Sequence, residues 1–307
     1  MLKKFLITFF KKILYSLISG NNFFRLPCLS NIYKFFYKIF VKSKGVILID
    51  VQGNKIYTDC RDEGITPFLL TQRVYEEYET YIFKEMIKPG MNVVDIGANI
   101  GYYSLIAAKL VGDSGTVFSF EPDPKNYELL IKNIEINRYK NIIPIPKAVS
   151  NRKEKVQLFI DKNNYGNPSF SKNNIGAFSG FIEVETTTLD DYFRKISYGN
   201  SHKNFNIDFI KLDTQGAEGL AIEGGEKILK NNNLIIMMEF WPYGLKNIGT
   251  NPVNLLNKLE ELDFDIFMIE KSSHSIYRVE ISEVLNIFEY EKNCKGCINL
   301  FFKRQIY

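Results

Sequence analysis

Residues 92–121 constrain the fold of this chain more than any other stretch. Their side chains predict a short apolar strand at 93–96, a tight turn at 97–101, an apolar-periodic helix at 102–111 and a second apolar strand at 116–120. A strand, a crossover helix and a parallel second strand form the βαβ unit from which open α/β sheets are built. The segment therefore predicts an α/β domain.

The turn and the residue after the second strand predict a ligand. Gly97 and Gly101 remove side chains where the backbone turns, so amide groups at the start of the helix can approach a bound molecule. Glu121 follows the second strand, where its carboxylate can accept hydrogen bonds from two ribose hydroxyls. A dinucleotide-binding turn would read G-x-G-x-x-G, and Asn99 and Tyr102 replace its second and third glycines. We therefore expect a nucleoside without a pyrophosphate.

Three motifs, in this order along the chain, resemble those of one enzyme family. Asp95-Ile-Gly97-Ala-Asn99-Ile-Gly101 resembles the D/E-x-G-x-G-x-G motif of class I methyltransferases that use S-adenosylmethionine (SAM), with Asn99 in place of the central glycine. Together with Glu121-Pro122 and Lys211-Leu-Asp213-Thr-Gln-Gly-Ala-Glu218, it is similar to the FkbM-type methyltransferases over residues 88–270. This resemblance implies a Rossmann-like, mostly parallel seven-stranded sheet with helices on both faces.

The resemblance also implies which residues bind SAM. They lie in the turn and at the ends of strands: Asp95, Gly97, Asn99, Gly101, Tyr102, Glu121, Ala148 and Asp213. Because the carboxyl ends of parallel strands line one edge of a sheet, we expect Asp95, Glu121, Asp213 and Glu239 to converge there. Asp213 and Glu239 are the predicted catalytic residues. Three roles stay open for Asp213: a general base, a metal ligand with Glu239, or a partner of the methionine ammonium group.

Histidine and cysteine add little to this site. His202 and His274 are the only histidines, and neither lies in a known motif, so surface or packing roles are expected. Cys294-Lys-Gly-Cys297 has the spacing of a redox or zinc pair, but no second pair completes a tetrahedral site. A divalent metal is therefore not indicated. Four scattered cysteines in 307 residues fit a reducing compartment, which predicts a cytoplasmic protein.

The start of the chain differs from the rest in charge. Residues 1–49 hold nine lysines or arginines and no acidic residue; because the whole chain has a net charge of +4, the remainder carries −5. Residues 1–20 place leucines and phenylalanines on one helical face and lysines on or beside the other. Their apolar run is far shorter than the ~20 residues that span a bilayer. Two interpretations stay open: the helix lies on an anionic membrane, or it packs on the catalytic domain or a dimer partner.

Composition places a domain boundary at Gly45, with an N-terminal extension at 1–45 and a catalytic domain at 46–307. Within that domain, residues 64–88 are predicted to form one helix. Residues 161–180 form a long polar stretch, rich in Asn, Ser and Gly, between two predicted strands. Loops of this length are usually functional or mobile, and we expect a lid over the substrate.

The predicted function is SAM-dependent transfer of a methyl group to a hydroxyl of a sugar, glycolipid or natural-product acceptor, as the resemblance implies. Peripheral attachment to the inner face of the membrane through residues 1–45 would bring the enzyme to such an acceptor. Two alternatives stay open: a non-catalytic nucleoside-binding scaffold on a membrane, and an NAD-dependent oxidoreductase, which the missing glycines disfavour. A nucleic-acid partner is disfavoured too, because the positive charge is confined to the extension. The oligomeric state is not predicted.

Overall fold

The computed structural model describes residues 44–199, 206–231, 233–270, 275–290 and 296–304. The predicted N-terminal helix, His202, His274 and Cys294 lie outside the described residues. The chain divides into two compact units between Tyr75 and Glu76. The boundary predicted at Gly45 stays a prediction, because residues 1–43 are not described. Among the helices that are described, none is long and apolar enough to cross a bilayer.

The first unit contains an antiparallel hairpin and a short helix. β1 (Val46–Val51) pairs with β2 (Asn54–Asp59) along their full lengths. Gln52 and Gly53 connect them with φ angles of 51° and 75°, the positive values that a tight two-residue hairpin turn favours. α3 (Thr66–Thr71) follows.

The prediction of one helix at 64–88 is wrong. The segment holds two helices, α3 and α4 (Glu77–Met86), separated by residues 72–76. Arg73 and Glu76 lie in this break at φ angles of 59° and 46°. Such left-handed residues interrupt a right-handed helix, and the apolar periodicity of a sequence does not reveal them.

The second unit is built on an eight-stranded sheet in the order β12-β11-β13-β10-β9-β3-β4-β5. Five neighbouring strands are parallel: β10 (Ile235–Phe240), β9 (Phe209–Leu212), β3 (Asn92–Ile96), β4 (Thr116–Phe120) and β5 (Ile142–Ile145). β13 (Ile298–Lys303) runs antiparallel between β10 and β11 (Asp265–Glu270), and β12 (Ser275–Arg278) pairs with β11 at the edge. The predicted α/β fold with a mostly parallel sheet is confirmed, with β12 as a strand beyond the seven expected.

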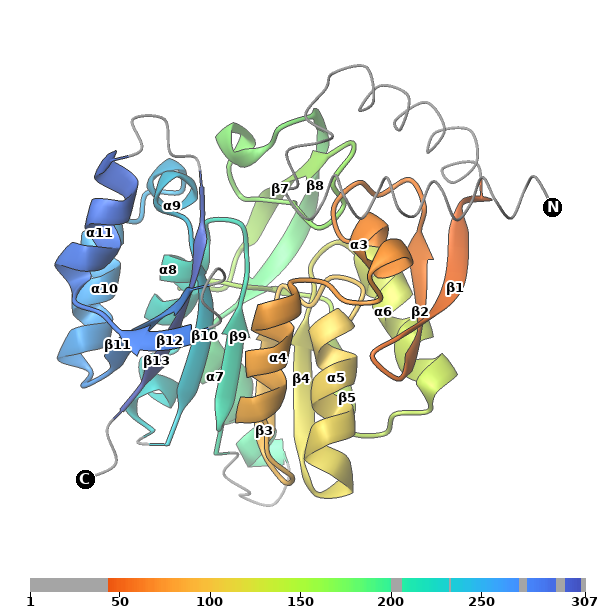
Figure 1. Cartoon of the computed structure of the whole chain (residues 1–307), viewed down its shortest axis with the longest axis horizontal. Helices are drawn as coiled ribbons and strands as arrows, with labels where there is room; N and C mark the ends of the chain where they lie inside the picture. The colour runs from red at the N-terminus through yellow and green to blue at the C-terminus, as the bar shows by residue number, and fades with distance from the viewer. Residues whose placement is uncertain (1–43, 200–205, 232, 271–274, 291–295, 305–307) are drawn as a thin grey trace. The chain divides into compact units, whose positions relative to one another are not determined.

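Helices cover both faces of this sheet (Figure 1). On one face, the ring of Phe83 from α4 lies 5.2 Å from that of Phe209 in β9, and Ser104 of α5 (Tyr102–Val111) bonds to Asp95 of β3. The other face holds the main core, which includes residues of α7 (Leu189–Gly199), α8 (Glu218–Glu223), α10 (Pro252–Glu261) and α11 (Ile281–Tyr290). Because both faces are covered, every residue of β9 is buried.

One longer helix of this unit follows the end of β4. α6 (Pro124–Asn137) begins after Asp123, whose carboxylate accepts hydrogen bonds from the backbone N–H groups of Lys125 (2.7 Å) and Asn126 (3.2 Å). This is the N-cap geometry that starts a helix. The others are short: α9 (Pro242–Asn247) and the 3₁₀ helices η3 (Gly112–Ser114) and η5 (Ile228–Lys230).

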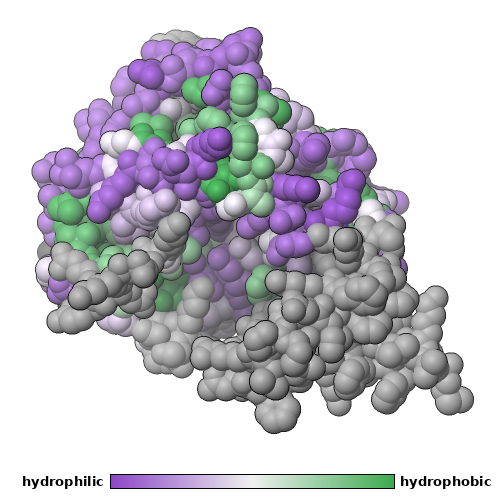
Figure 2. Space-filling model, turned by 90° about the horizontal axis from the view of Figure 1, so that it is seen from above, coloured by the Kyte–Doolittle hydropathy of each residue, from purple (hydrophilic) through white to green (hydrophobic). Residues whose placement is uncertain are grey.

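A smaller three-stranded sheet carries the predicted lid. Its order is β6 (Ala148–Val149), β8 (Phe178–Thr187) and β7 (Lys155–Asp161). Residues 162–177, which we call the lid, connect β7 to β8 and include the 3₁₀ helix η4 (Lys172–Asn174). Phe178 and Phe181 of β8 are exposed. Figure 2 shows one face of the molecule, on which apolar residues gather in places among hydrophilic ones.

Candidate active site

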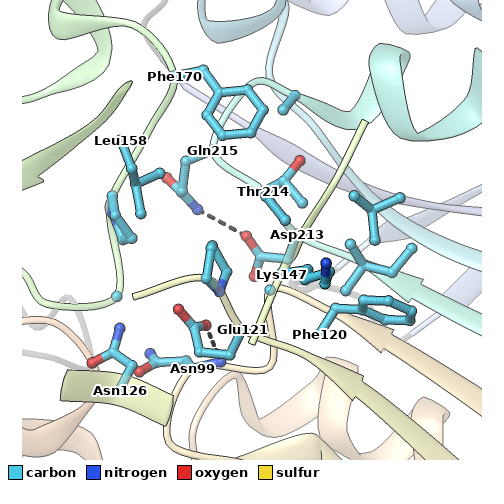
Figure 3. A pocket seen from close by; sticks show the side chains of 18 residues that line it. Asn99, Phe120, Glu121, Asn126, Lys147, Leu158, Phe170, Asp213, Thr214 and Gln215 are labelled. Carbon is cyan, nitrogen blue, oxygen red and sulfur yellow. Dashed lines mark hydrogen bonds between the residues drawn. The ribbon is translucent and has the colours of Figure 1, made fainter. Parts of the chain in front are cut away.

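The carboxyl ends of the parallel strands border a cavity whose empty volume, open solvent included, is about 500 Å³ (Figure 3). Backbone hydrogen bonds align these ends, since the N–H groups of Gly97, Glu121 and Asp213 each donate to the carbonyl at the end of a neighbouring strand. The strand order reverses between β3 and β9, and ligands of open α/β sheets bind at such a reversal.

The structure brings most of the predicted cofactor residues together around this cavity. Its lining includes Gly97, Asn99, Glu121, Ala148 and Asp213. Gly166, Pro168 and Phe170 also line the cavity, so part of the polar stretch predicted as a lid borders it. Four predicted residues are not in the lining: Asp95, Gly101, Tyr102 and Glu239.

Gly97 lets the turn after β3 pass directly beside the loop after β9. Its φ is +83°, and a β-carbon at this position would lie 1.8 Å from the carbonyl oxygen of Asp213, so only glycine fits. Asn99 also has a positive φ, 51°. Asparagine tolerates this conformation better than other residues with a side chain, which explains how it replaces the central glycine of the motif. Gly101 (φ +89°) faces Leu130, whose Cδ1 would lie 2.6 Å from a β-carbon.

Glu121 presents a buried carboxylate to the cavity. Its side chain is only 3% exposed. Oε2 accepts a hydrogen bond from the backbone N–H of Asn99 (2.7 Å), and Oε1 accepts one from Asp123 (2.8 Å). Burial raises the pKa of Glu121 to about 8, although the two backbone bonds oppose the shift. The group can therefore change its protonation state near neutral pH.

Asp95 and Tyr102 hold the helices that support the turn. The Asp95 carboxylate is buried and accepts a 2.5 Å hydrogen bond from Ser104 of α5. The Tyr102 hydroxyl lies 3.1 Å from the Thr80 hydroxyl of α4. Both side chains thus fasten a helix to its neighbours, and the direct contact with SAM that the resemblance implies for them stays a prediction.

Asp213 and Glu239 are joined by a residue to which the resemblance assigned no role. The amide nitrogen of Gln215 donates to Asp213 Oδ1 (2.8 Å) and to Glu239 Oε2 (3.1 Å). Lys211 Nζ donates to the other oxygen of Asp213 (3.1 Å). The bridge therefore orients both predicted catalytic carboxyl groups. Lys211 could have been found from the sequence, because residues two apart in a strand point to the same face.

Burial and charge act together on this cluster. Burial alone would lower the pKa of Lys211, but the nearby carboxylates, Asp213 first, outweigh it and hold that pKa above its ordinary value. Burial, followed by the charges of Asp213 and Glu218, holds the pKa of Glu239 well above its usual range. Burial and these charges therefore favour the protonated form of Glu239.

Glu218 shapes the loop that carries Gln215. Its Oε1 accepts hydrogen bonds from the backbone N–H groups of Thr214 (2.8 Å) and Gly216 (3.2 Å), and from the Thr214 hydroxyl (3.0 Å). The side chain is fully buried, and Oε2 has no hydrogen-bond partner among the described residues. Burial raises the pKa of Glu218, which favours the neutral acid.

Metal ligands do not gather at this site in the described ranges. Over those residues, no group of three or more His, Cys, Asp or Glu side chains is placed to hold a metal ion. His202, His274 and Cys294 fall outside them, so the expectations for these side chains stay predictions.

Comparison with known proteins identifies a family and several partial relatives. The model of the Methyltransferase FkbM domain matches residues 95–266. A protein-L-isoaspartate O-methyltransferase of Methanothrix thermoacetophila is 39% identical over 56 residues, which are 18% of this chain and 27% of that protein. The catalytic subunit TRM61 of a tRNA (adenine(58)-N(1))-methyltransferase from Yarrowia lipolytica is 30% identical over 82 residues, 26% of this chain and 21% of that protein. The chain thus spans 27% and 21% of the length of these two curated relatives.

One of the similar solved structures is a methyltransferase FkbM from Methylobacillus flagellatus KT. The match covers 78% of this chain and 58% of that one, with 15% identity and a TM-score of 0.40.

Proposed function

Because the chain belongs to the FkbM family of methyltransferases, we propose that it transfers the methyl group of SAM to a hydroxyl oxygen of a sugar, glycolipid or natural product. The observation that carries this proposal is the cavity bordered by Glu121, after β4, and Asp213, after β9. In Figure 3 both carboxylates point into it. We assign the nucleoside to Glu121 and the acceptor to Asp213.

SAM is the cofactor, and the residues around the cavity fit it. Each oxygen of Glu121 accepts one backbone hydrogen bond, and an ionised carboxylate has about four acceptor positions. Each oxygen therefore keeps capacity for a ribose hydroxyl. Ala148, Leu158 and Phe170 supply apolar walls for a flat ring. When bound, SAM supplies a methyl group on a positively charged sulfur, where a nucleophile can attack it.

Asp213 is the residue best placed to take the proton that a hydroxyl acceptor must lose. Its two oxygens are held by Gln215 and Lys211, so the carboxylate keeps one orientation at the wall of the cavity. Glu239 accepts from the same Gln215 amide, and burial favours its protonated form. We therefore assign the general base to Asp213 and give Glu239 the task of holding Gln215. Contact between Asp213 and the methionine ammonium group is the alternative role.

The basic extension supports a location on the inner face of the membrane. Residues 1–45 combine nine positive charges with a helical stripe of leucine and phenylalanine, a combination that anionic lipids attract. A glycolipid acceptor would be reached from there. Neither the non-catalytic scaffold nor the NAD-dependent oxidoreductase gains support from the matched family.

The test is to incubate the purified protein with SAM carrying a labelled methyl group and with fractionated cell extract, and to find the labelled product by mass spectrometry. We expect a product that gains one methyl group on oxygen, and about 100-fold less of it with the Asp213→Asn variant. Failure of the parent protein to bind SAM in calorimetry would refute the proposal. A labelled nitrogen or carbon atom in the product would refute the acceptor class alone.

A further inference from the structure

The two ends of the lid are clasped by one buried carboxylate. Asp161 is 5% exposed. Its Oδ1 accepts hydrogen bonds from the backbone N–H groups of Asn163 (2.8 Å) and Asn164 (3.0 Å), and its Oδ2 accepts from Gly176 (3.1 Å) and Ala177 (2.9 Å). These four hydrogen bonds hold the two ends of the lid together, and none of them involves Asp213 or Glu239.

A second attachment joins the middle of the lid to the loop after β9. Asn174 is 5% exposed, and its amide nitrogen lies within bonding distance of three oxygens, those of the Ser169 hydroxyl (3.0 Å), the Gln215 carbonyl (3.0 Å) and the Gly244 carbonyl (3.2 Å). Its own oxygen accepts from the amide of Asn247 (2.7 Å). One buried side chain therefore ties together the lid, the loop after β9 and α9.

Ser169 strengthens the same attachment. Its hydroxyl, buried with the rest of the residue, donates to the Gln215 carbonyl at 2.7 Å. Space around the attachment is tight, because a β-carbon on Gly216 would lie 2.6 Å from both Asn174 Nδ2 and the Gly244 carbonyl oxygen. A side chain at position 216 would therefore displace the Asn174 amide or the Gly244 backbone.

Gln215 connects this attachment to Asp213 and Glu239. Its backbone lies in the left-handed region, with φ of 57°, a conformation that costs energy for a residue of this kind and persists only when neighbours hold it. Two lid side chains hold its carbonyl, while its own amide bridges Asp213 and Glu239. Figure 3 shows the Gln215 side chain reaching toward Asp213 from beside Phe170 of the lid.

We propose that Asn174 is a positioning residue that couples the lid to Gln215, so that seating of the lid over the SAM cavity and placement of the Gln215 amide between Asp213 and Glu239 are one event. The inference rests on the proposed function, which gives Asp213 and Glu239 their roles. It adds that the enzyme completes its proton-accepting site only when the lid is seated. An open lid then leaves bound SAM without an oriented base.

Asn174→Asp tests the coupling, with Asn173→Asp as a matched control. The aspartate has almost the size of asparagine and can still accept from Asn247, but it cannot donate to the three oxygens that face it. Asn173 is the exposed neighbour, so the control makes the same change of charge one residue away. Amide hydrogen exchange of the ligand-free protein is measured for the lid and for residues 213–217, with β3 and β4 as an internal reference.

The coupling predicts that Asn174→Asp speeds exchange in both segments by about tenfold or more, as loss of buried hydrogen bonds would allow. The strands β3 and β4 should be unchanged, and Asn173→Asp should behave as the parent. Faster exchange in the lid alone would overturn the inference, because the lid would then open without Gln215. Equal exchange in Asn174→Asp and Asn173→Asp would overturn it as well.

A second variant covers the case in which Asn174→Asp unfolds and speeds exchange in β3 and β4. Ser169→Ala removes one donor to the Gln215 carbonyl without burying a charge, and it should speed exchange of the lid and of residues 213–217 together, by about threefold or more. No change in residues 213–217 refutes the coupling. Calorimetry with S-adenosylhomocysteine tests the proposed function separately from the coupling of the lid to Gln215. A parent protein that does not bind this ligand contradicts the proposed function. The exchange rates of the lid and of residues 213–217 still decide the coupling.

Discussion

The affinity for SAM is expected to rise about tenfold between pH 7 and pH 9, because Glu121 must be ionised to accept hydrogen bonds from both ribose hydroxyls. Burial raises the pKa of Glu121 in the ligand-free protein to about 8. At pH 7 only about a tenth of the molecules then carry the carboxylate, and at pH 9 about nine tenths do. SAM binds the protein with ionised Glu121. The affinity is therefore highest well above pH 8 and falls as the pH drops through 8.

Calorimetry in two buffers with different enthalpies of ionisation measures this directly. At pH 7 the parent should release close to one proton for each SAM bound, and at pH 9 close to none. The Glu121→Gln variant keeps the shape of the side chain but cannot ionise, so its affinity should lack this rise. Titration of the ligand's own amino group occurs with both proteins, and the difference between them therefore reports Glu121.

Parent and Glu121→Gln proteins with the same dependence of affinity on pH would refute this account of Glu121. Its assignment to the ribose would fall if Glu121→Ala bound SAM within twofold of the parent, because removing an ionised acceptor from two hydroxyls should cost ~2–3 kcal/mol.

Three further predictions follow from the site, the turn and the extension. Asp213→Asn should lower methyl transfer by about 100-fold or more with a smaller loss of SAM affinity, as measured with labelled SAM and active extract, if the residue is the base; inhibition of the parent by a chelator, reversed by Mg²⁺, would indicate a metal ligand instead. Gly97→Ala should lower the free energy of unfolding by about 3 kcal/mol or more, because its β-carbon would lie 1.8 Å from the Asp213 carbonyl oxygen. The control Gly249→Ala, at φ +93° with nothing within 4 Å of its β-carbon, should cost about 1–2 kcal/mol in the same denaturant titration. Deletion of residues 1–44 should release the protein from anionic vesicles in a sedimentation assay and leave SAM affinity unchanged, because the cofactor residues begin at Asp95. If the parent does not bind vesicles and the truncated protein aggregates, the N-terminal helix instead packs on protein.

The general arrangement of the site could be predicted because it depends on the direction of the chain. An apolar run that ends in Glu121 or Asp213 places that residue at one edge of a parallel sheet, whatever the details of packing. The cavity lining bears this out for both residues. The cap at Asp123 is equally local, since its acceptors and donors are neighbours in sequence.

Side-chain direction within the turn could not be predicted, because distant helices determine it. Asp95 turns to Ser104, and Tyr102 turns to Thr80 of α4. The role of Asn174 was equally hidden. The lid contains several asparagines, and only the packing of α9 and the loop after β9 decides that Asn174 is buried while Asn173 is exposed.

The position of β13 determines when the sheet can be completed. β13 follows every other described strand of that sheet in the sequence, yet it lies between β10 and β11 and forms backbone hydrogen bonds to both. During synthesis, the edge of β10 and the edge of β11 that pair with β13 must therefore stay open until residues 298–303 have been made. Unpaired strand edges are sites where chains associate wrongly. Chaperone dependence during translation, and poor solubility of chains truncated before residue 298, are the expected consequences of this topology.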